Sequence, residues 1–366
     1  MAAPTSASYS SRMAALVAVP IAWGTYGSAV KLAYALPEVP PSPILQLSFS
    51  VVSFAGLFLA AALADGGGVR ESAAGEAEDA PGAPSAAAQP DAVRAGLELG
   101  LYLFLGASIQ LQGLQRTDAA RAGFLVQLTT VLVPLVESAL LGRRLPPQLL
   151  GACGAATLGI GLISAESLSG SGSGDPLGDA LVATSALLYT AHVIRLGECA
   201  SAIAPLRLAR AKAGAQVGYG TITALSLTLS GGFDAPAYVS SASSADLAVL
   251  AGVALWIGLI PSAFTTWAQS YGQAAVPPSA ANVLYSLQPV WTALIAWLVL
   301  GEALALPEAI GGACIVVASL LATTQPPTDG GGGETGPPDD GSDDDPRRGR
   351  SVGALSAAAP STAREG

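Results

Sequence analysis

The chain has 366 residues, of which 51% are hydrophobic and only 11% are charged, and its formal net charge is −10. Soluble domains carry about a quarter charged residues, so this composition excludes an ordinary soluble protein. The negative charge says little about partners, because fourteen of the 26 acidic residues fall in two polar segments, between 65 and 91 and after 324.

The apolar residues form ten runs, each near the roughly 20 residues that cross about 30 Å of hydrocarbon as a helix. We predict a transmembrane helix at each run. The ten spans are Met13–Ala35, Ile44–Ala64, Ala95–Gln112, Ala119–Leu141, Pro147–Ala165, Leu177–Leu196, Ala213–Ser230, Leu247–Ala268, Ser279–Leu300 and Ala305–Ala322.

Composition also divides the chain into segments. We predict an N-terminal tail (1–12), a first five-helix repeat (13–165), a Gly/Ser linker (166–176), a second five-helix repeat (177–323) and a disordered tail (324–366). The Gly-, Ala-, Pro- and acid-rich stretch 65–93 lacks periodicity and is predicted to be a disordered loop inside the first repeat.

The two halves repeat each other. Gly113–Ser164 aligns without a gap on Gly272–Thr323, and both stretches run through a polar elbow, an apolar span, a Leu-Gly stop and a second span. Because each half has five spans, the second half must cross the membrane in the opposite direction. The predicted fold is an all-α membrane protein of ten helices in two inverted five-helix repeats, an arrangement typical of transporters with a site between the halves.

Lys and Arg concentrate in cytoplasmic loops, so their distribution predicts orientation. With the N-terminus in the cytoplasm, or in the stroma of an organelle, the inward-facing cations are Arg12, Arg70, Arg94, Arg143, Arg144, Arg195, Arg207, Arg210 and Lys212. The outward-facing cations are only Lys31, Arg116 and Arg121. Both termini are therefore predicted to be cytoplasmic or stromal, and the identity of the membrane stays open.

Several stretches together resemble the EamA-type permeases of the drug/metabolite transporter superfamily. They read AWGTYGSAVK from Ala22, GLQRTDAARAGFLVQLTTVLVPL from Gly113, LLGRR from Leu140 and SAANVLYSLQPVWTALIAWLVLGEAL from Ser279. The resemblance implies a ten-helix carrier whose central cavity opens to one side at a time and moves small metabolites such as amino acids or nucleobases.

The chain departs from this family's pattern at one position, where Gln46 stands in place of an Arg that many members have in the second helix. The superfamily's sugar-phosphate translocators bind phosphate through basic residues in late helices. Here no Lys or Arg lies between Lys212 and Arg347. A phosphorylated substrate is therefore not expected.

Polar residues within membrane spans are costly and are candidates for function. Gln127, Thr130, Pro134 and Glu137 recur on one face of the fourth span. The residues predicted to bind substrate are Trp23, Tyr26, Gln110, Gln127, Tyr189, His192, Asn282, Tyr285 and Gln288. The alternative role for each amide is a hydrogen bond to a neighbouring helix, and Trp23 also suits a packing or interface position.

His192 is the single histidine. It either titrates during transport or is simply a polar residue near the inner end of its helix. One histidine does not supply the clustered groups of an active site, and the three cysteines lack metal-ligand spacing. We therefore expect no enzyme activity, no metal and no cofactor.

The predicted function is secondary transport of a small organic metabolite by alternating access, since the sequence contains no GxxxxGK[ST] phosphate-binding loop. The alternatives are an ion or water channel, for which no filter pattern is visible, and a non-transporting membrane scaffold. The expected partners are a small-molecule substrate and membrane lipid, without nucleic acid, and a homodimer stays an open alternative.

Overall fold

The structure is a computed structural model. It describes residues 6–66, 92–140, 147–169, 175–200, 202–274, 276, 281 and 284–323. The predicted tail 324–366 lies outside these residues, as do most of the predicted loop 65–93 and the middle of the linker 166–176. The described part of the chain is all-helical and contains no β-strand.

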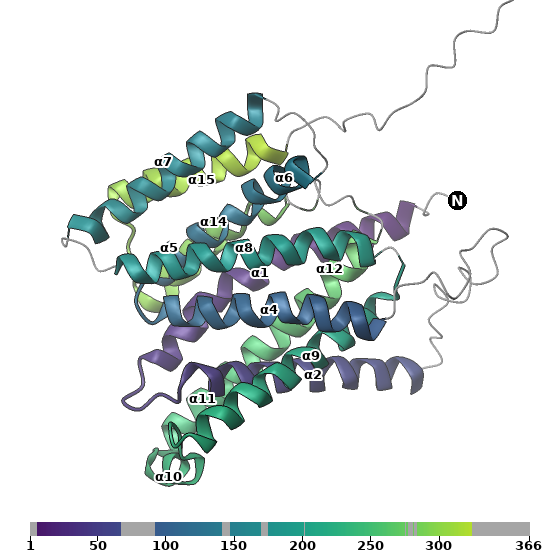
Figure 1. The fold of residues 1–366 in the computed structure, drawn as a ribbon, viewed down its shortest axis with the longest axis vertical. Helices are drawn as coiled ribbons and strands as arrows, with labels where there is room; N and C mark the ends of the chain where they lie inside the picture. The colour runs from purple at the N-terminus through teal and green to yellow at the C-terminus, as the bar shows by residue number, and fades with distance from the viewer. Residues whose placement is uncertain are drawn as a thin grey trace, which may run out of the picture. The chain divides into compact units, whose positions relative to one another are not determined.

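Figure 1 shows the helices in chain order. They are α1 (Ser6–Tyr34), α2 (Ser42–Gly66), α4 (Ala92–Leu114), α5 (Ala119–Val126), α6 (Leu128–Leu140), α7 (Pro147–Ser169), α8 (Pro176–Ala200), α9 (Pro205–Leu229), α10 (Ala235–Ser241), α11 (Ser244–Ile257), the π-helical segment η2 (Gly258–Phe264), α12 (Thr265–Gln273), α14 (Gln288–Leu300) and α15 (Leu306–Thr323).

Five of these helical stretches are long and apolar enough to cross a membrane. By length and composition they are Ser10–Tyr34, Ser42–Leu63, Ala92–Leu114, Pro176–Ala200 and Ser244–Gln273, counted over the described ranges alone. Four further apolar helices are shorter. Exposed Leu, Ile, Val and Phe side chains are frequent on the long helices, as expected where the solvent is hydrocarbon.

The helices differ from the predicted spans in four informative ways. Helix α1 begins at Ser6, inside the predicted tail. The fourth span is divided at Gln127 into α5 and α6. Helix α9 begins at Pro205 rather than at Ala213, because a proline at the first helical turn loses no hydrogen bond and its fixed φ favours helix initiation. Helix α10, in the connection before α11, was not predicted.

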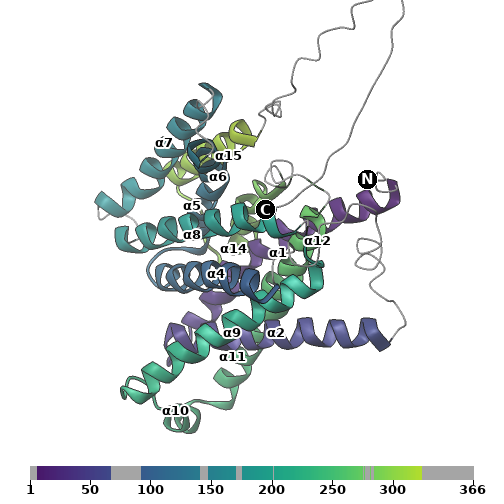
Figure 2. The same cartoon turned by 45° about the vertical axis from the view of Figure 1, so that its right-hand side comes forward.

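Helices from the two halves pack against each other in matched pairs. The final helices α7 and α15 lie side by side in Figures 1 and 2, and α2 packs along α9. Helix α4 packs on α8 and α9, while η2 and α12 pack on α2 and α1. Helix α14 packs on α1, and α5 and α6 pack on α8.

Small residues allow the closest of these approaches. A Cβ atom on Gly159 of α7 would lie 2.6 Å from the carbonyl oxygen of Gly311 in α15. A Cβ on Gly100 of α4 would lie 2.8 Å from the carbonyl oxygen of Lys212 in α9. In a membrane, close backbone contact of this kind supplies the packing that holds helices together, so both glycines fix the helix spacing around the interior.

Candidate functional site

A cavity of about 170 Å³ lies inside the helix bundle. Its walls come from α1, α4, α5, α6, α8, α9, η2, α12 and α14, so both halves of the chain contribute. Its aromatic side chains are Trp23, Tyr26, Tyr189 and Tyr285. Its amide side chains are Gln110, Gln127, Gln216, Gln269 and Gln288. Its hydroxyl side chains are Thr129, Thr130, Ser262, Thr265, Thr266 and Thr292.

The structure brings eight of the nine sequence-predicted residues to this cavity. They are Trp23, Tyr26, Gln110, Gln127, Tyr189, His192, Tyr285 and Gln288. The ninth, Asn282, lies outside the described residues, as do the side chains of Pro134 and Glu137. The location of the eight is thereby known, whereas their role in substrate binding stays a prediction.

One wall of the cavity is an aromatic pair joined to the eighth span. The rings of Trp23 and Tyr285 lie 5.2 Å apart with 59° between their planes, a tilted geometry that aromatic pairs favour. The Trp23 indole Nε1 donates a hydrogen bond to Thr265 Oγ1 at 3.2 Å. Gln273 Nε2 donates to the Tyr285 hydroxyl at 3.2 Å. These bonds hold both rings in fixed positions.

A second wall is formed where α8 faces α4. The Tyr189 hydroxyl donates a hydrogen bond to Gln110 Oε1 at 2.7 Å. A Cβ atom on Gly106 of α4 would lie 2.7 Å from the Tyr189 ring, so the glycine makes room for the ring to lie flat against α4. Tyr189 and Gln110 therefore form one hydrogen-bonded unit. The Tyr189 hydroxyl oxygen can still accept a hydrogen bond, and the Gln110 amide nitrogen can still donate.

Three buried polar atoms on the cavity lining have no hydrogen-bond partner among the described residues. They are the Tyr26 hydroxyl, Gln127 Nε2 and His192 Nε2. Buried polar groups in proteins are nearly always satisfied by protein, water or ligand. These three atoms are consequently the strongest candidates for direct bonds to a bound molecule or to ordered water.

Regular helix is interrupted at the cavity. The helix of the fourth span is interrupted at Gln127, between α5 and α6. The main-chain N–H of Gln127 donates a hydrogen bond to the Phe124 carbonyl oxygen. The eighth span changes to π-helix around Pro261. Irregular backbone at membrane depth is tolerated where it lines a cavity, and π-helical turns are frequent at functional sites. Both interruptions place main-chain groups next to polar side chains.

One complete polar stripe was not predicted from the sequence. Ser262, Thr265, Thr266 and Gln269 of the eighth span all line the cavity. Their spacing of i, i+3, i+4 and i+7 is the helical pattern that identified Gln127 and Thr130, so it could have been found. Gln216 on α9 was also missed; it stands alone in an apolar stretch and offers no comparable pattern.

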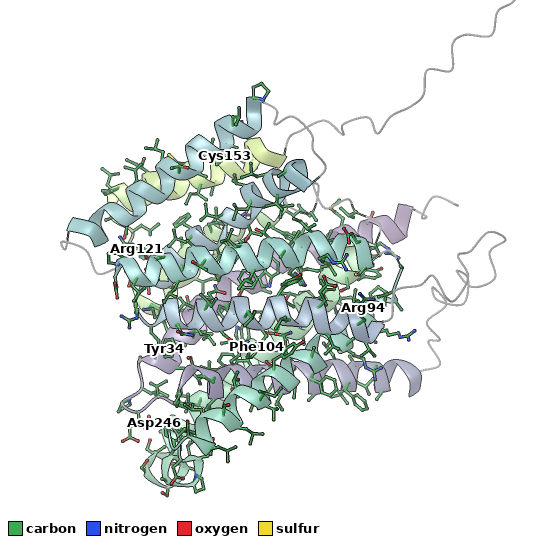
Figure 3. The ribbon with its side chains drawn as sticks, viewed as in Figure 1. Tyr34, Arg94, Phe104, Arg121, Cys153 and Asp246 are labelled. Carbon is green, nitrogen blue, oxygen red and sulfur yellow. The ribbon has the colours of Figure 1, made fainter. Side chains whose placement is uncertain are left out.

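The lining contains no Asp, Glu, Lys or Arg among the residues that the structure describes, and His192 is its single imidazole. Arg121 and Arg94, labelled in Figure 3, lie at opposite sides of the bundle and outside this lining. Arg121 on α5 is 1% exposed and its Nε lies 2.7 Å from Glu308 Oε1 on α15. This ion pair joins the two halves.

The polar contacts around Arg121 extend across the same end of the bundle. Both carboxylate oxygens of Glu302 accept main-chain N–H groups at the start of α5, from Ala119 at 3.3 Å and from Ala120 at 3.1 Å. Thr117 Oγ1 donates to Asp179 Oδ1 at 2.6 Å. A carboxylate at a helix N-terminus is favourable because it meets unpaired N–H groups and the positive end of the dipole.

Lys212 corrects an expectation from the sequence. It was placed with the inward-facing cations, next to a span beginning at Ala213, but it lies within α9 and its side chain is fully buried. Its Nζ donates to Ser270 Oγ of α12 at 3.3 Å. The seventh helix therefore does carry cations, namely Arg207, Arg210 and Lys212, although none of them lines the cavity.

These features define a class: a helical membrane protein built around a neutral polar and aromatic cavity. The EamA-like transporter family matches residues 11–165 and 204–324, and the chain belongs to this family. The protein is accordingly an integral multi-pass membrane protein of the drug/metabolite transporter superfamily, whose members are transporters and not enzymes. Helix α8 falls between the two matched ranges.

A solved structure described only as "Crystal structure of protein" is similar in fold. It aligns with a TM-score of 0.54 and 22% sequence identity over 86% of this chain and 96% of the other. At that identity the likeness concerns the fold alone. No curated protein matches the sequence.

Proposed function

We propose that the protein is a secondary transporter that moves a small, unphosphorylated organic metabolite, such as an amino acid or a nucleobase, by alternating access. The observation that carries the proposal is the cavity, which is lined from both halves of the chain by aromatic, amide and hydroxyl side chains and contains no charged side chain among its described residues apart from the titratable His192.

The pattern of helix pairing supports a fold of two inverted five-helix repeats. The distribution of Lys and Arg supports the proposal that both termini lie on the cytoplasmic or stromal side. Several of the most extensive pairings of a first-half helix with a second-half helix have a counterpart with the halves exchanged. Helix α4 packs on α8 and α9 as η2 and α12 pack on α1 and α2, while α7–α15 and α2–α9 are self-related pairs. Rocking of one repeat against the other around a fixed site is the usual motion of such folds.

The volume of the cavity limits the size of the substrate. One water needs about 10–15 Å³ of cavity volume. The cavity of 170 Å³ therefore has room for on the order of ten water-sized groups. A single amino acid or nucleobase is of this size, whereas a lipid or a dinucleotide is far larger. The flat faces of Trp23 and Tyr285 suit an apolar or aromatic part of the substrate, and the amides suit its polar edge.

The charge of the lining argues against a phosphorylated substrate. Phosphate in a buried site usually has Arg or Lys as its partner, and neither residue type lines the cavity among the described residues. Moving a multiply charged group from water into such a site without a partner is very costly. A neutral molecule avoids this cost, and a zwitterion lowers it because its two opposite charges attract each other and can be hydrogen-bonded by amides and hydroxyls.

The test is a thermal-shift screen of the purified protein with phenylalanine, glutamine, adenine and uracil, and with uridine monophosphate as the phosphorylated counterpart of uracil. Ligand at a hundred times Kd should raise the free energy of unfolding by about 2.7 kcal/mol. We expect stabilisation by at least one unphosphorylated compound, and its loss in Tyr285→Ala and Gln127→Ala.

The matched control is Tyr238→Ala, because Tyr238 lies on α10, outside the cavity. This variant should keep the stabilisation. A shift that survives both cavity substitutions, or a shift produced by uridine monophosphate alone, would contradict the proposal.

A further inference from the structure

Two buried groups that can each carry a positive charge lie on two helices that both line the cavity, α8 and α9. His192 on α8 is 2% exposed, lines the cavity and has an Nε2 without a hydrogen-bond partner among the described residues. Lys212 on α9 is fully buried, and Leu208, one turn before it, belongs to the same buried cluster as Leu196, one turn after His192. The lysine is held by Ser270 on α12, whose hydroxyl in turn donates to the Thr266 carbonyl at 2.9 Å.

Neither group has an acidic partner among the described residues, which give ion pairs for Arg116, Arg121 and Arg195 but none for His192 or Lys212. The titratable groups around Cys199, which also interacts with Lys212, are Arg195 and Glu198 on α8 and Glu98 on α4.

The nearby acids are already engaged. Arg195 Nε and Nη2 donate to the two oxygens of Glu98 at 2.6 and 2.8 Å, and Arg195 Nη1 pairs with Glu198. Arg210 of α9 lies over the Phe58 ring at 5.2 Å. Among the described residues, no free carboxylate is therefore available to neutralise a second positive charge next to Lys212; the side chain of Glu137 on α6, which packs on α8, lies outside them.

We propose that His192 and Lys212 form a proton-binding pair that holds one proton between them and couples the proposed transport to protons. This inference rests on the proposed function. Two like charges in a water-poor interior oppose each other, so protonation of one group disfavours protonation of the other. A buried charge without a partner is also costly, so the second proton stays off and the pair exchanges a single one.

The position of His192 explains how the proton reaches the substrate site. A neutral imidazole has one donor and one acceptor nitrogen, whereas the protonated ring has two donors. A change in the charge of the pair therefore alters what the cavity wall offers to a bound molecule at Nε2. Lys212 does not touch the cavity, so it acts on the substrate through His192.

The sequence makes the pair directly observable. The chain has one histidine and two lysines, Lys31 and Lys212. Nitrogen-15 labelling of histidine in the full-length protein gives the signals of one imidazole, and its titration followed by NMR reports His192 without any substrate. Lys212→Gln removes the neighbouring charge, Lys212→Arg makes it permanent because guanidinium does not deprotonate, and Lys31→Gln is the control.

We expect the imidazole to take up its proton at a pH at least about one unit higher in Lys212→Gln than in Lys212→Arg, with Lys31→Gln identical to the wild type. If Lys212 had only a structural role, the pH at which the imidazole takes up its proton would not depend on whether residue 212 is charged. Coincident titration curves in all four proteins would overturn the shared proton. Unchanged elution on size-exclusion chromatography confirms that each variant is folded.

Coupling is tested in proteoliposomes that contain the pH-sensitive dye pyranine. Net uptake of phenylalanine, glutamine, adenine or uracil into substrate-free proteoliposomes should change the internal pH in the wild type and not in His192→Gln, whereas one-for-one exchange moves no net protons. Net uptake without any pH change in the wild type would overturn the coupling. No exchange of any of the four compounds would overturn the proposed function, and the coupling with it, while NMR still decides whether the pair shares a proton.

Discussion

Two regions of the molecule each bury a long cationic side chain, but only one of them supplies a carboxylate partner among the described residues. Around Arg121, the guanidinium is 1% exposed and lies 2.7 Å from the Glu308 carboxylate, and Glu302 caps the start of the same helix. Around Lys212, the ammonium is fully buried and has the hydroxyl of Ser270 at 3.3 Å, with no ion pair to any described acid.

The difference contrasts a paired, structural charge with an unpaired one that we propose to be functional. Arg stays charged under all ordinary conditions, whereas Lys gives up its proton readily when buried. The always-charged residue is accordingly the one with a carboxylate, and it ties α5 to α15. The lysine, next to His192 and the cavity, is the one whose charge can change.

The largest expected effect is at the paired cation. Arg121→Met leaves Glu308 buried without its partner and should lower the free energy of unfolding by about 3–5 kcal/mol. The double variant Arg121→Met/Glu308→Gln removes both charges and keeps an oxygen for the Ala305 N–H that Glu308 accepts. Thermal unfolding in detergent should show the double variant clearly more stable than the single one; an additive loss would contradict a direct pair.

The second prediction concerns the unpaired cation. Lys212→Met removes a charge without leaving an opposite one behind, and the Met side chain fills much of the same volume. The free energy of unfolding should change by less than about 1 kcal/mol or rise, since replacing a buried charge by an apolar group is often neutral or stabilising. A loss as large as that of Arg121→Met would show that Lys212 has a hidden acidic partner.

A smaller effect is expected at the helix cap beside Arg121. Glu302→Ala removes the acceptor of the Ala119 and Ala120 N–H groups and should lower the free energy of unfolding by about 1 kcal/mol. Glu302→Gln keeps one side-chain oxygen and should lose less. Equal losses in the two variants, measured by thermal unfolding at pH 7, would argue that the charge rather than the hydrogen bond is what matters.

The smallest effect is expected at the exposed ion pair of the same end. The Leu177 N–H, and after it the Arg116 guanidinium, hold the pKa of Asp175 below its usual value. A carboxyl group with a lowered pKa stabilises the fold above its unfolded pKa of about 3.9, and this contribution is lost as the pH falls further. The wild type and Asp175→Asn should therefore differ slightly in Tm at pH 7 and converge near pH 3; a difference that persists in acid would contradict this origin.

Much of the interior could be predicted because polar residues in apolar spans are few and costly. That rule identified Trp23, Tyr26, Gln127 and Tyr285, which the structure brings to one cavity, although helices far apart in sequence supply them. The composition likewise predicted the helical membrane class, which the family match and the long apolar helices confirm. The inverted repeat itself stays a proposal.

Other features of the fold and the site could not be predicted, because they depend on helix boundaries and on packing rather than on the pattern of polar residues. Lys212 was assigned to a loop because cations usually end a span, whereas Pro205 starts the helix earlier and carries the lysine inward. The break at Gln127 follows no proline or glycine at that position. The pairing of Arg121 with Glu308 joins residues 187 positions apart, and only the packing of α5 against α15 brings them together.

Counterflow tests the central claim, that the cavity is a transport site, most directly. Proteoliposomes preloaded with unlabelled phenylalanine, glutamine, adenine and uracil are given trace amounts of each radiolabelled compound in turn. A carrier should accumulate label transiently in the wild type and lose this activity in Trp23→Leu, while Trp297→Leu, which alters an exposed tryptophan outside the cavity, should keep it. Label that only equilibrates, as through a channel, or accumulation that survives Trp23→Leu, would contradict the account.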